Sequence, residues 1–398
     1  MDKTTKKPDV PAIRFKGFTD AWEQRPLSVI AHSFEYGLNA AAKEYDGKHR
    51  YIRITDIDDD SREFSTEDIT SPDVEYDAAD SYILKKGDLL FARTGASVGK
   101  TYLYREKDGL VYFAGFLIRA KIRSEYYDEF VFQNTLTDNY NQYIRITSQR
   151  SGQPGVNAQE YGEYTLMIPN HDEQVRIGEL FRHLDRLITL HQRKLDKLHN
   201  VKKSLLEKMF PRNGADVPEI RFSGFTYAWE QRKVKELCSI STGKSNTQDK
   251  IDDGIYPFYV RSPIIEKSNK YLYDEEAVIT VGDGVGTGKV FHYVNGKYDL
   301  HQRCYRMYGF SDELDAKYFY HTFSHLFYKR VMAMTAKTSV DSVRLEMISD
   351  MEIPNPCIIE QQAIGQYFTN LDTLITLHQR KLEKLRQIKR SLLEKMFV

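Results

Sequence analysis

Two segments of the chain combine glycines with a lysine, as phosphate-binding loops do. The first is TGASVGKT at 94–101, and the second is DGVGTGKV at 283–290. A nucleotide-binding P-loop needs a glycine five residues before the glycine of the Gly-Lys pair, and a Ser or Thr after the lysine. Thr94 and Asp283 occupy the first of these positions, and Val290 follows the second lysine. Nucleotide hydrolysis is therefore not the predicted chemistry.

The same segments are better suited to contact a nucleic acid. Glycines let one backbone approach another closely, and the ammonium group of Lys100 or Lys289 can bind a phosphate. Arg93 can donate two parallel hydrogen bonds to a guanine edge. We therefore predict two DNA-facing turns with these contact residues: Arg93, Thr94, Ser97 and Lys100 in the first, and Asp283, Thr287 and Lys289 in the second.

Other polar loops lie between aromatic runs and combine Arg, Lys, Gln or Asn with small hydroxyl residues. Gln pairs well with adenine and Arg with guanine in the major groove. We predict base or phosphate contacts from these loops as groups, whereas a solvated loop without a ligand is the alternative for any single residue. The predicted residues are Arg145, Ser148, Gln149, Arg150 and Gln153 in the first half, and Lys244, Ser245, Asn246, Arg261, Gln302, Arg303, Lys337, Thr338 and Ser339 in the second.

Motifs for bond-making chemistry are missing from the sequence. An amino-methyltransferase needs an acidic-Pro-Pro-aromatic or Asn-Pro-Pro-aromatic segment, and the Pro-Asn-Pro-Cys at 354–357 has the wrong order. We find no glycine-rich methyl-donor loop after a predicted strand and no compact nuclease set. Three scattered cysteines argue against structural zinc or a disulfide framework and fit a reduced cytosol. We predict no catalytic, cofactor-binding or metal site in this chain.

Composition indicates a soluble globular chain. It has 398 residues, of which 41% are hydrophobic and 29% charged, and this length suits two to three domains. We expect no membrane span and no secretory signal. The formal net charge is +0, whereas phosphate contacts need local positive charge. Basic faces balanced by acidic segments such as 56–60, or DNA contacts shared with a partner, would reconcile the two.

A segment that occurs twice must position these loops. Residues 173–210 and 360–397 share LITLHQRKL and SLLEKMF. Apolar residues recur at alternating spacings of four and three, which is typical of a coiled-coil seam. We predict that the two helices pack together through this seam: Ile177, Phe181, Leu184, Ile188, Leu195, Leu198, Ile364, Phe368, Leu371, Ile375, Leu382 and Leu385. Polar seam positions are predicted to fix register or orientation: His191, Lys202, His378 and Lys389.

A second repeat begins each half of the chain. Residues 11–25 and 218–232 differ at only three positions, and each block carries one of the two tryptophans. We interpret each block as an Ile-Arg-Phe strand followed by a buried Trp. The bodies that follow, roughly 26–170 and 233–355, contain short aromatic and β-branched runs typical of strands. Each body also has a helical stretch, at 128–144 and 315–332.

The predicted fold class is α+β with a pseudo-twofold internal repeat. Two α/β domains with twisted, mostly antiparallel sheets are separated by a pair of long helices that form an antiparallel coiled coil. This arrangement resembles the specificity (S) subunit of Type I restriction–modification systems. The resemblance covers nearly the whole chain. It rests on two unlike bodies, each followed by Ile-Pro-Asn, a Glu-Gln pair and a near-identical helix, and on the segments 87–104 and 277–294.

The resemblance implies target-recognition domains at 1–170 and 212–356, with spacer helices at 171–211 and 357–398. Each domain would read one half of an asymmetric bipartite site in double-stranded DNA. The helices would set the gap and dock two modification (adenine methyltransferase) subunits, with restriction subunits joining for cleavage. A helix of about 38 residues is about 57 Å long, compared with about 34 Å for one turn of DNA.

By the same resemblance, methylation and cleavage belong to partner chains in a cytoplasmic complex, and S-adenosylmethionine, ATP and Mg bind there. The recognition chain itself is expected to be non-catalytic. One alternative from a different class remains open on the residues alone. It is a coiled-coil scaffold whose two bodies bind protein or glycan ligands.

Overall fold

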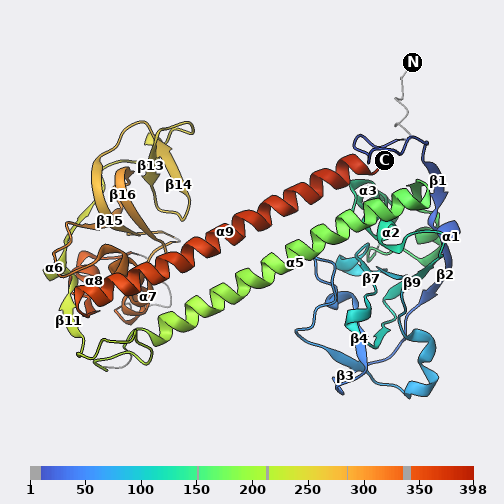
Figure 1. The fold of residues 1–398 in the computed structure, drawn as a ribbon, viewed down its shortest axis with the longest axis horizontal. Helices are drawn as coiled ribbons and strands as arrows, with labels where there is room; N and C mark the ends of the chain where they lie inside the picture. The colour runs from blue at the N-terminus through green and yellow to red at the C-terminus, as the bar shows by residue number, and fades with distance from the viewer. Residues whose placement is uncertain (1–9, 150–151, 212–214, 285, 335–341) are drawn as a thin grey trace. The chain divides into compact units, whose positions relative to one another are not determined.

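The computed structural model describes residues 10–149, 152–211, 215–284, 286–334 and 342–398. The chain divides into two compact units, residues 1–193 with 380–398, and residues 194–379. Each unit combines one α+β body with parts of two long helices, α5 (His171–Lys208) and α9 (Ile358–Met396) (Figure 1). Among the described residues, none of the helices has the length and apolar character to cross a bilayer.

The first unit contains two four-stranded sheets. The antiparallel sheet has the order β2-β9-β6-β7: Ala31–Tyr36, Leu117–Ile122, Asp88–Ala92 and Thr101–Leu103. The other has the order β3-β5-β4-β8, in which β4 and β8 run parallel: Ala42–Glu44, Thr70–Pro72, Arg50–Ile52 and Val111–Phe113. A separate antiparallel pair joins β1 (Glu23–Pro26) to β10 (Thr165–Ile168).

Short helices complete the first body. They are α1 (Leu27–Ile30), α2 (Asp128–Asn134), α3 (Asp138–Thr147) and α4 (Ala158–Glu163), with 3-10 turns at Ile54–Asp56, Tyr76–Ala78, Asp80–Tyr82, Gly95–Ser97 and Glu106–Asp108. The single helical stretch predicted at 128–144 is two helices. The break occurs because Thr137 caps α3, its hydroxyl accepting a hydrogen bond from the Tyr140 N–H.

The second body is built on one six-stranded sheet. Its order is β12-β17-β15-β16-β13-β14: Ser239–Thr242, Cys304–Tyr308, Tyr273–Val281, Phe291–Leu300, Tyr256–Tyr259 and Ile265–Ser268. Of these neighbours, β13 and β16 run parallel and the others antiparallel. The remaining elements are β11 (Glu230–Lys233), which pairs with β18 (Glu352–Asn355), α6 (Val234–Leu237), α7 (Ala316–Ala333), α8 (Leu345–Ser349) and the 3-10 turn Thr247–Asp249.

The repeated block before each body binds a long helix through an arginine and does not form the predicted strand. We call the resulting ion pairs, Arg14–Glu173 and Arg221–Glu360, the clasps. Residues 13–15 form no strand, and Arg14 donates through Nε and Nη2 to both carboxylate oxygens of Glu173, at 2.7 Å each. In the second unit, Arg221 binds Glu360 in the same way, at 2.7 and 2.8 Å. Both glutamate side chains are fully buried, so each has its charge balanced by a bidentate partner. The strand prediction was wrong because Arg14 binds the long helix α5 instead of taking part in a sheet.

The two tryptophans that follow the clasps are buried, as predicted, with 3% of Trp22 and 3% of Trp229 exposed. Each packs at ring-contact distance from an aromatic residue of its own body: Trp22 lies 5.8 Å from Phe130, and Trp229 lies 6.3 Å from Tyr318. The clasp and the tryptophan thus tie the start of each body both to the long helix and to the core.

A glutamine next to each clasp aligns the body with the long helix. The Gln174 side chain accepts from the Tyr127 N–H at 3.0 Å and donates to the Pro169 carbonyl at 2.9 Å. Gln361 repeats both contacts, with the Asp315 N–H at 3.0 Å and the Pro356 carbonyl at 2.8 Å. The Glu-Gln pair that begins each repeat therefore fixes both the preceding strand and the body helix beside it.

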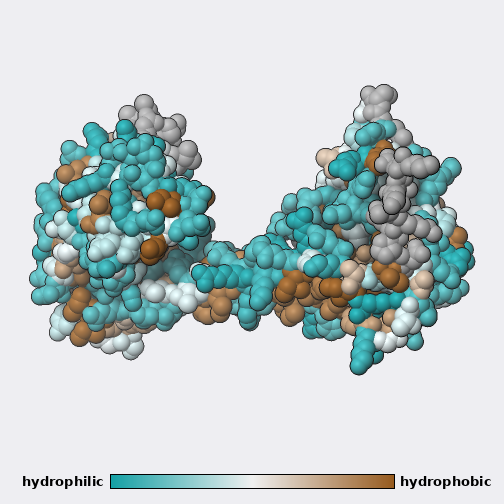
Figure 2. Space-filling model, turned by 90° about the horizontal axis from the view of Figure 1, so that it is seen from above, coloured by the Kyte–Doolittle hydropathy of each residue, from teal (hydrophilic) through white to brown (hydrophobic). Residues whose placement is uncertain are grey.

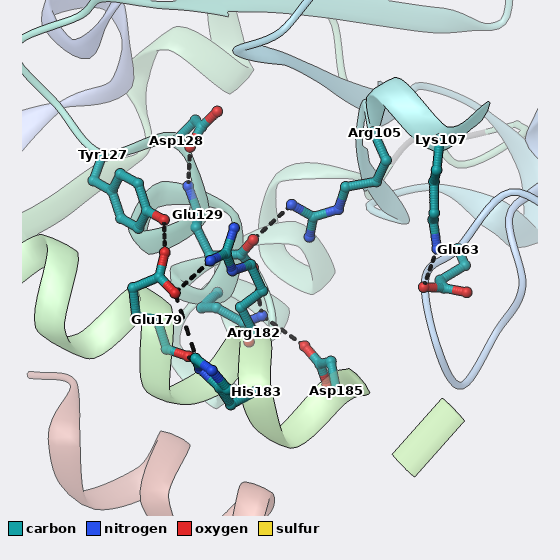
Figure 3. A network of polar contacts seen from close by, with 11 residues as sticks. Glu63, Arg105, Lys107, Tyr127, Asp128, Glu129, Glu179, Arg182, His183 and Asp185 are labelled. Atoms are coloured by element: carbon teal, nitrogen blue, oxygen red, sulfur yellow. Dashed lines mark hydrogen bonds and ion pairs between the residues drawn. The ribbon is translucent and has the colours of Figure 1, made fainter. Parts of the chain in front are cut away.

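Further polar contacts bind the first body to α5 (Figure 3). The Gln133 amide donates to Glu129 at 3.0 Å and to Asp185 of α5 at 2.8 Å. Arg105 donates to the other oxygen of Glu129 at 2.6 Å, and the Tyr127 hydroxyl donates to Glu179 at 2.5 Å. Such a connected network resists rotation of the body about the helix more than isolated contacts do.

Within each unit the long helices run antiparallel. In the first unit, Asp185 of α5 binds Lys389 of α9 at 2.6 Å, and the rings of Phe181 and Phe397 lie 5.7 Å apart. In the second unit, Lys202 binds Asp372 at 2.5 Å. The two lysines predicted as polar seam positions therefore each pair with an aspartate of the opposite helix, which specifies the antiparallel register.

Most of the predicted seam is buried. Ile188, Leu198 and Leu385 are half-buried, as are the polar positions His191 and His378. The buried members are Ile177, Phe181, Leu184, Leu195, Ile364, Phe368, Leu371, Ile375 and Leu382. The predicted α+β class, with its repeat, its largely antiparallel sheets and its antiparallel helices, is confirmed.

Replacing Arg14 with alanine tests the clasp. The Arg14→Ala change leaves the Glu173 carboxylate buried without its charged partner, so we expect the free energy of unfolding to fall by about 3 kcal/mol. Arg14→Lys should recover only part of this, because an ammonium group does not match both carboxylate oxygens. Urea titration followed by circular dichroism measures the change.

The matched control is Arg25→Ala. Arg25 pairs with Glu23, but their side chains are 48% and 69% exposed, so the loss should stay below about 1 kcal/mol. Equal effects of the two alanine variants would show that the clasp is no stronger than a surface ion pair.

Candidate functional site

Both Gly-Lys turns connect two strands. The first lies between β6 and β7, and the second between β15 and β16. A P-loop continues into a helix whose N-terminus receives the phosphate. Strands follow Lys100 and Lys289 closely here, so the arrangement agrees with the sequence argument against a nucleotide site.

The two turns share one backbone framework. In the first unit, the Arg93 N–H donates to the Phe116 carbonyl at 3.0 Å, and the Val156 N–H donates to the Arg93 carbonyl at 2.9 Å. In the second unit, the Gly282 N–H donates to the Arg303 carbonyl at 2.8 Å, and the Val343 N–H donates to the Gly282 carbonyl at 2.7 Å. Arg93 is therefore equivalent in position to Gly282, and Phe116 to Arg303.

A glycine permits the close approach of a third loop in each unit. A Cβ atom on Gly37 would lie 2.1 Å from the Ala114 carbonyl oxygen, and one on Gly243 would lie 2.1 Å from the Leu300 carbonyl oxygen. Their N–H groups donate to Leu117 and Cys304, at 3.0 and 3.1 Å. Each framework thus joins three loops from distant parts of the body.

In the first unit the framework carries an arginine between two exposed rings. The Arg93 guanidinium lies 5.0 Å from the ring centre of Tyr36 and 5.9 Å from that of Phe116. Tyr36 and Phe116 are 45% and 57% exposed as whole residues. A guanidinium held by cation–π contacts beside exposed aromatic surface can meet a planar, electron-rich ligand. Sequence reasoning did not single out Tyr36 or Phe116, because most aromatic residues of the bodies are core.

Other predicted residues of the first unit gather near Arg93. Thr94 forms a β-bridge with Gly155, and the Gly95 N–H donates to the Pro154 carbonyl at 3.0 Å. This brings the loop that contains the exposed Gln153 against the turn. Among the other predicted residues, Ser97 and Lys100 are half-buried, and Arg145 and Gln149 are exposed. Arg150 falls outside the described residues.

The ammonium group of Lys100 already has a partner. It lies 2.5 Å from a carboxylate oxygen of Asp59, in the acidic segment that the sequence predicted would balance basic faces. A phosphate would have to compete with Asp59 for Lys100. Lys289, the equivalent residue of the second unit, is exposed, and its ammonium group lies 4.9 Å from the ring centre of Tyr328.

In the second unit the framework carries a charged cluster beside a hollow. Asp283 accepts hydrogen bonds from Arg303 and Arg261, at 2.5 and 3.3 Å. Burial raises the pKa of Asp283, but the hydrogen bonds from the two arginines outweigh it and lower the pKa below its ordinary value. The Gln302 amide donates to the Asn246 side chain at 2.6 Å. The hollow has a volume of about 500 Å³ and is lined by Asn246, Thr247, Gln248, Arg261, His301, Gln302 and Arg303.

Three predicted hydroxyl contacts are buried inside turns. Ser245 donates to Asp299 at 2.6 Å and Thr287 to the Gly284 carbonyl at 2.5 Å, whereas Ser148 is 8% exposed. Burial contradicts a surface role for these three residues, because turn geometry has already used or covered their hydroxyl groups. Lys244 is exposed, whereas Lys337, Thr338 and Ser339 lie outside the described residues.

The chain matches one known protein family twice along its length. A family model described as Type I restriction modification DNA specificity domain matches residues 20–200 and again residues 227–387. The Type I restriction enzyme MjaVIII specificity subunit of Methanocaldococcus jannaschii is 21% identical over 337 residues, covering 78% of each chain. The putative MjaX specificity subunit of the same organism is 21% identical over 405 residues, covering 94% of this chain and 92% of the relative.

A solved structure shares the fold. The crystal structure of the S subunit of a Type I restriction–modification system from M. genitalium superposes with a TM-score of 0.75. The match covers 98% of this chain and 99% of the other at 13% identity. At that identity, the similarity supports the fold alone.

The shared framework predicts that Gly37 tolerates no side chain. In Gly37→Ala the added Cβ meets a backbone oxygen, so the loop must move, and we expect a loss of unfolding free energy of about 2 kcal/mol or more. The matched control is Gly152→Ala, because a Cβ there meets no atom within 4 Å. Thermal unfolding of the two variants measures the difference, and equal midpoints would contradict the close approach.

Proposed function

The chain belongs to the family of Type I restriction modification DNA specificity domains, and from this premise we propose that it selects the DNA sequence on which a Type I restriction–modification complex acts. Each body would read one half of an asymmetric bipartite site in double-stranded DNA. The long helices would set the gap between the halves. These details extend beyond family membership.

The observation that carries the proposal is one backbone framework with two different sets of side chains. The first body presents Arg93 between two rings, whereas the second presents Arg261 and Arg303 on a carboxylate. Direct readout depends on which donors and acceptors reach the base edges. Equal frameworks with unequal side chains therefore suit two readers of different sequences. The alternative, a coiled-coil scaffold whose two bodies bind protein or glycan ligands, does not by itself call for Arg side chains on both frameworks.

We place methyl transfer and cleavage on partner subunits, together with S-adenosylmethionine, ATP and Mg. The reason is the family to which the chain belongs, together with a sequence in which we find no motifs for these reactions. The same division of labour explains the net charge of +0, because partner subunits would share the phosphate contacts. We expect the assembled complex to work in the cytoplasm.

Exposed leucines on the long helices support docking of two modification subunits. Leu187 and Leu190 of α5 are 44% and 49% exposed, and Leu374 and Leu377 of α9, at the repeated positions, are 44% and 50% exposed. Residues three apart lie on one helix face. In the space-filling view, hydrophobic surface interrupts the hydrophilic surface along the helices (Figure 2). One apolar face in each unit fits one partner helix for each copy of the repeat.

Mapping of methylated bases tests sequence selection. With its modification subunits, the chain should direct methylation to one gapped, two-part sequence. Arg93→Ala should relax the preference in one part only, because Arg93 belongs to one body. The exposed Arg25, outside both frameworks, supplies the control Arg25→Ala. Methylation or DNA enrichment without any sequence preference would favour the scaffold alternative.

The docking proposal predicts a change in stoichiometry. The pair Leu187→Glu and Leu190→Glu puts charge on an apolar contact, so we expect one modification subunit per chain instead of two. The matched pair Leu374→Glu and Leu377→Glu should do the same, and all four changes together should leave none. Native mass spectrometry measures the composition. Two bound subunits in the fourfold variant would refute this docking face.

A further inference from the structure

Two arginines share one aspartate at the hollow of the second unit. Nη1 of Arg303 and Nη1 of Arg261 approach different oxygens of Asp283, at 2.5 and 3.3 Å. The Asp283 side chain is 17% exposed, whereas those of Arg261 and Arg303 are 44% and 61% exposed. A largely covered carboxylate thus supports two cations that reach the surface.

Backbone packing enforces this arrangement. A Cβ on Gly282 would lie 2.5 Å from the Arg303 carbonyl oxygen, so the chain before Asp283 can pass this close only as glycine. The Arg303 N–H also donates to Nδ1 of the buried His301 at 3.1 Å. The backbone of Arg303 is therefore held at both its N–H and its carbonyl, and Asp283 follows directly after the close approach.

The remaining donors define the ligand. Among the described residues, the two guanidinium groups donate hydrogen bonds through Nη1 only, and Nε and Nη2 of each group have no acceptor there. These are two parallel donors in one plane. The guanine edge in the major groove presents two acceptors, O6 and N7, at the matching separation. Arg261, Arg303 and Asp283 together carry one net positive charge, so a phosphate can also accept these hydrogen bonds. Loss of the guanine N7 acceptor distinguishes the two ligands, because it leaves the phosphates unchanged.

We propose that Arg303, positioned by Asp283 and flanked by Arg261, reads one guanine in the half-site bound by the second body. This inference rests on the proposed function of sequence selection and adds the base and the residue that reads it. The first body does not repeat the device. Phe116 stands in the place of Arg303, and Thr94, which forms the equivalent β-bridge, stands in the place of Asp283. The aspartate-held arginine, and the guanine contact proposed for it, therefore belong to the second body only.

The experiment measures binding of the complete complex with its modification subunits to duplexes that contain the mapped site. Guanine at each position of the second half is replaced in turn by 7-deazaguanine, which lacks the N7 acceptor but keeps O6 and the base pair. At one position, this should weaken binding by wild-type protein about tenfold. In Arg303→Ala, 7-deazaguanine at that position should weaken binding no further. Arg303→Lys should regain only part of the wild-type sensitivity to the replaced base.

Asp283→Asn tests the positioning role separately. The change removes a negative charge near DNA, so affinity for duplexes without the site should stay the same or rise. Discrimination at the guanine should fall, because the guanidinium is no longer held in one plane. A role limited to stability would lower both affinities together. The exposed Lys267 provides the control Lys267→Ala, for which we expect wild-type discrimination.

The outcomes separate the inference from the function on which it rests. If wild-type complex prefers no sequence in either half, the proposed function fails. If it prefers a bipartite site but Arg303→Ala keeps the same sensitivity to 7-deazaguanine at every position, the inference alone is overturned. Loss of preference in both halves from Arg303→Ala, with normal circular dichroism, would also overturn it, because the effect would not be local.

Discussion

The fully buried carboxylates of Glu173 and Glu360 are the constraint on which the rest of the structure depends. A buried charge is costly unless a partner satisfies it, so each must be met by Arg14 or Arg221 from the segment that precedes its body. The neighbouring Gln174 and Gln361 then bind the end of the body and the start of its helix. One helix turn thus gathers three parts of the chain, and it does so twice.

Because this attachment is repeated, the chemistry of the bodies can differ without loss of geometry. The same backbone hydrogen bonds carry Arg93 and Phe116 in one body and Gly282 and Arg303 in the other. A guanidinium is held by aromatic rings in the first case and by a carboxylate in the second. Both devices order a long side chain before a ligand arrives, which reduces the entropy lost on binding.

Sequence patterns predicted the features that depend on periodicity and repetition. The seam spacing identified the two helices, and the polar positions Lys202 and Lys389 indicated an orientation device, which the structure completes with Asp372 and Asp185. The clasp was missed, because Arg14 and Glu173 are 159 residues apart and Ile-Arg-Phe also fits a strand. Contacts of that separation leave no local pattern.

Hydrogen bonding within turns and loop packing account for the other differences between the predicted and observed site residues. The hydroxyl groups of Ser245 and Thr287 resemble surface donors in the sequence, but short turns satisfy them internally. Tyr36 and Phe116 belong to residue types that usually lie in the core, and only the folded structure shows that both are exposed. Loop packing decides which of the many aromatic and hydroxyl residues face solvent. A single sequence contains no periodic pattern from which loop packing can be predicted.

The paired charges of the seam make each long helix complementary to its own sequence. Asp185 and Lys202 of α5 find Lys389 and Asp372 on α9, which are the same residue types at the repeated positions. Either helix would therefore accept a second copy of itself in the same antiparallel register. Correct closure depends on the high effective concentration that covalent linkage gives the two helices of one molecule. At high protein concentration or during refolding, exchange of helices between molecules is the characteristic error to which this architecture is exposed.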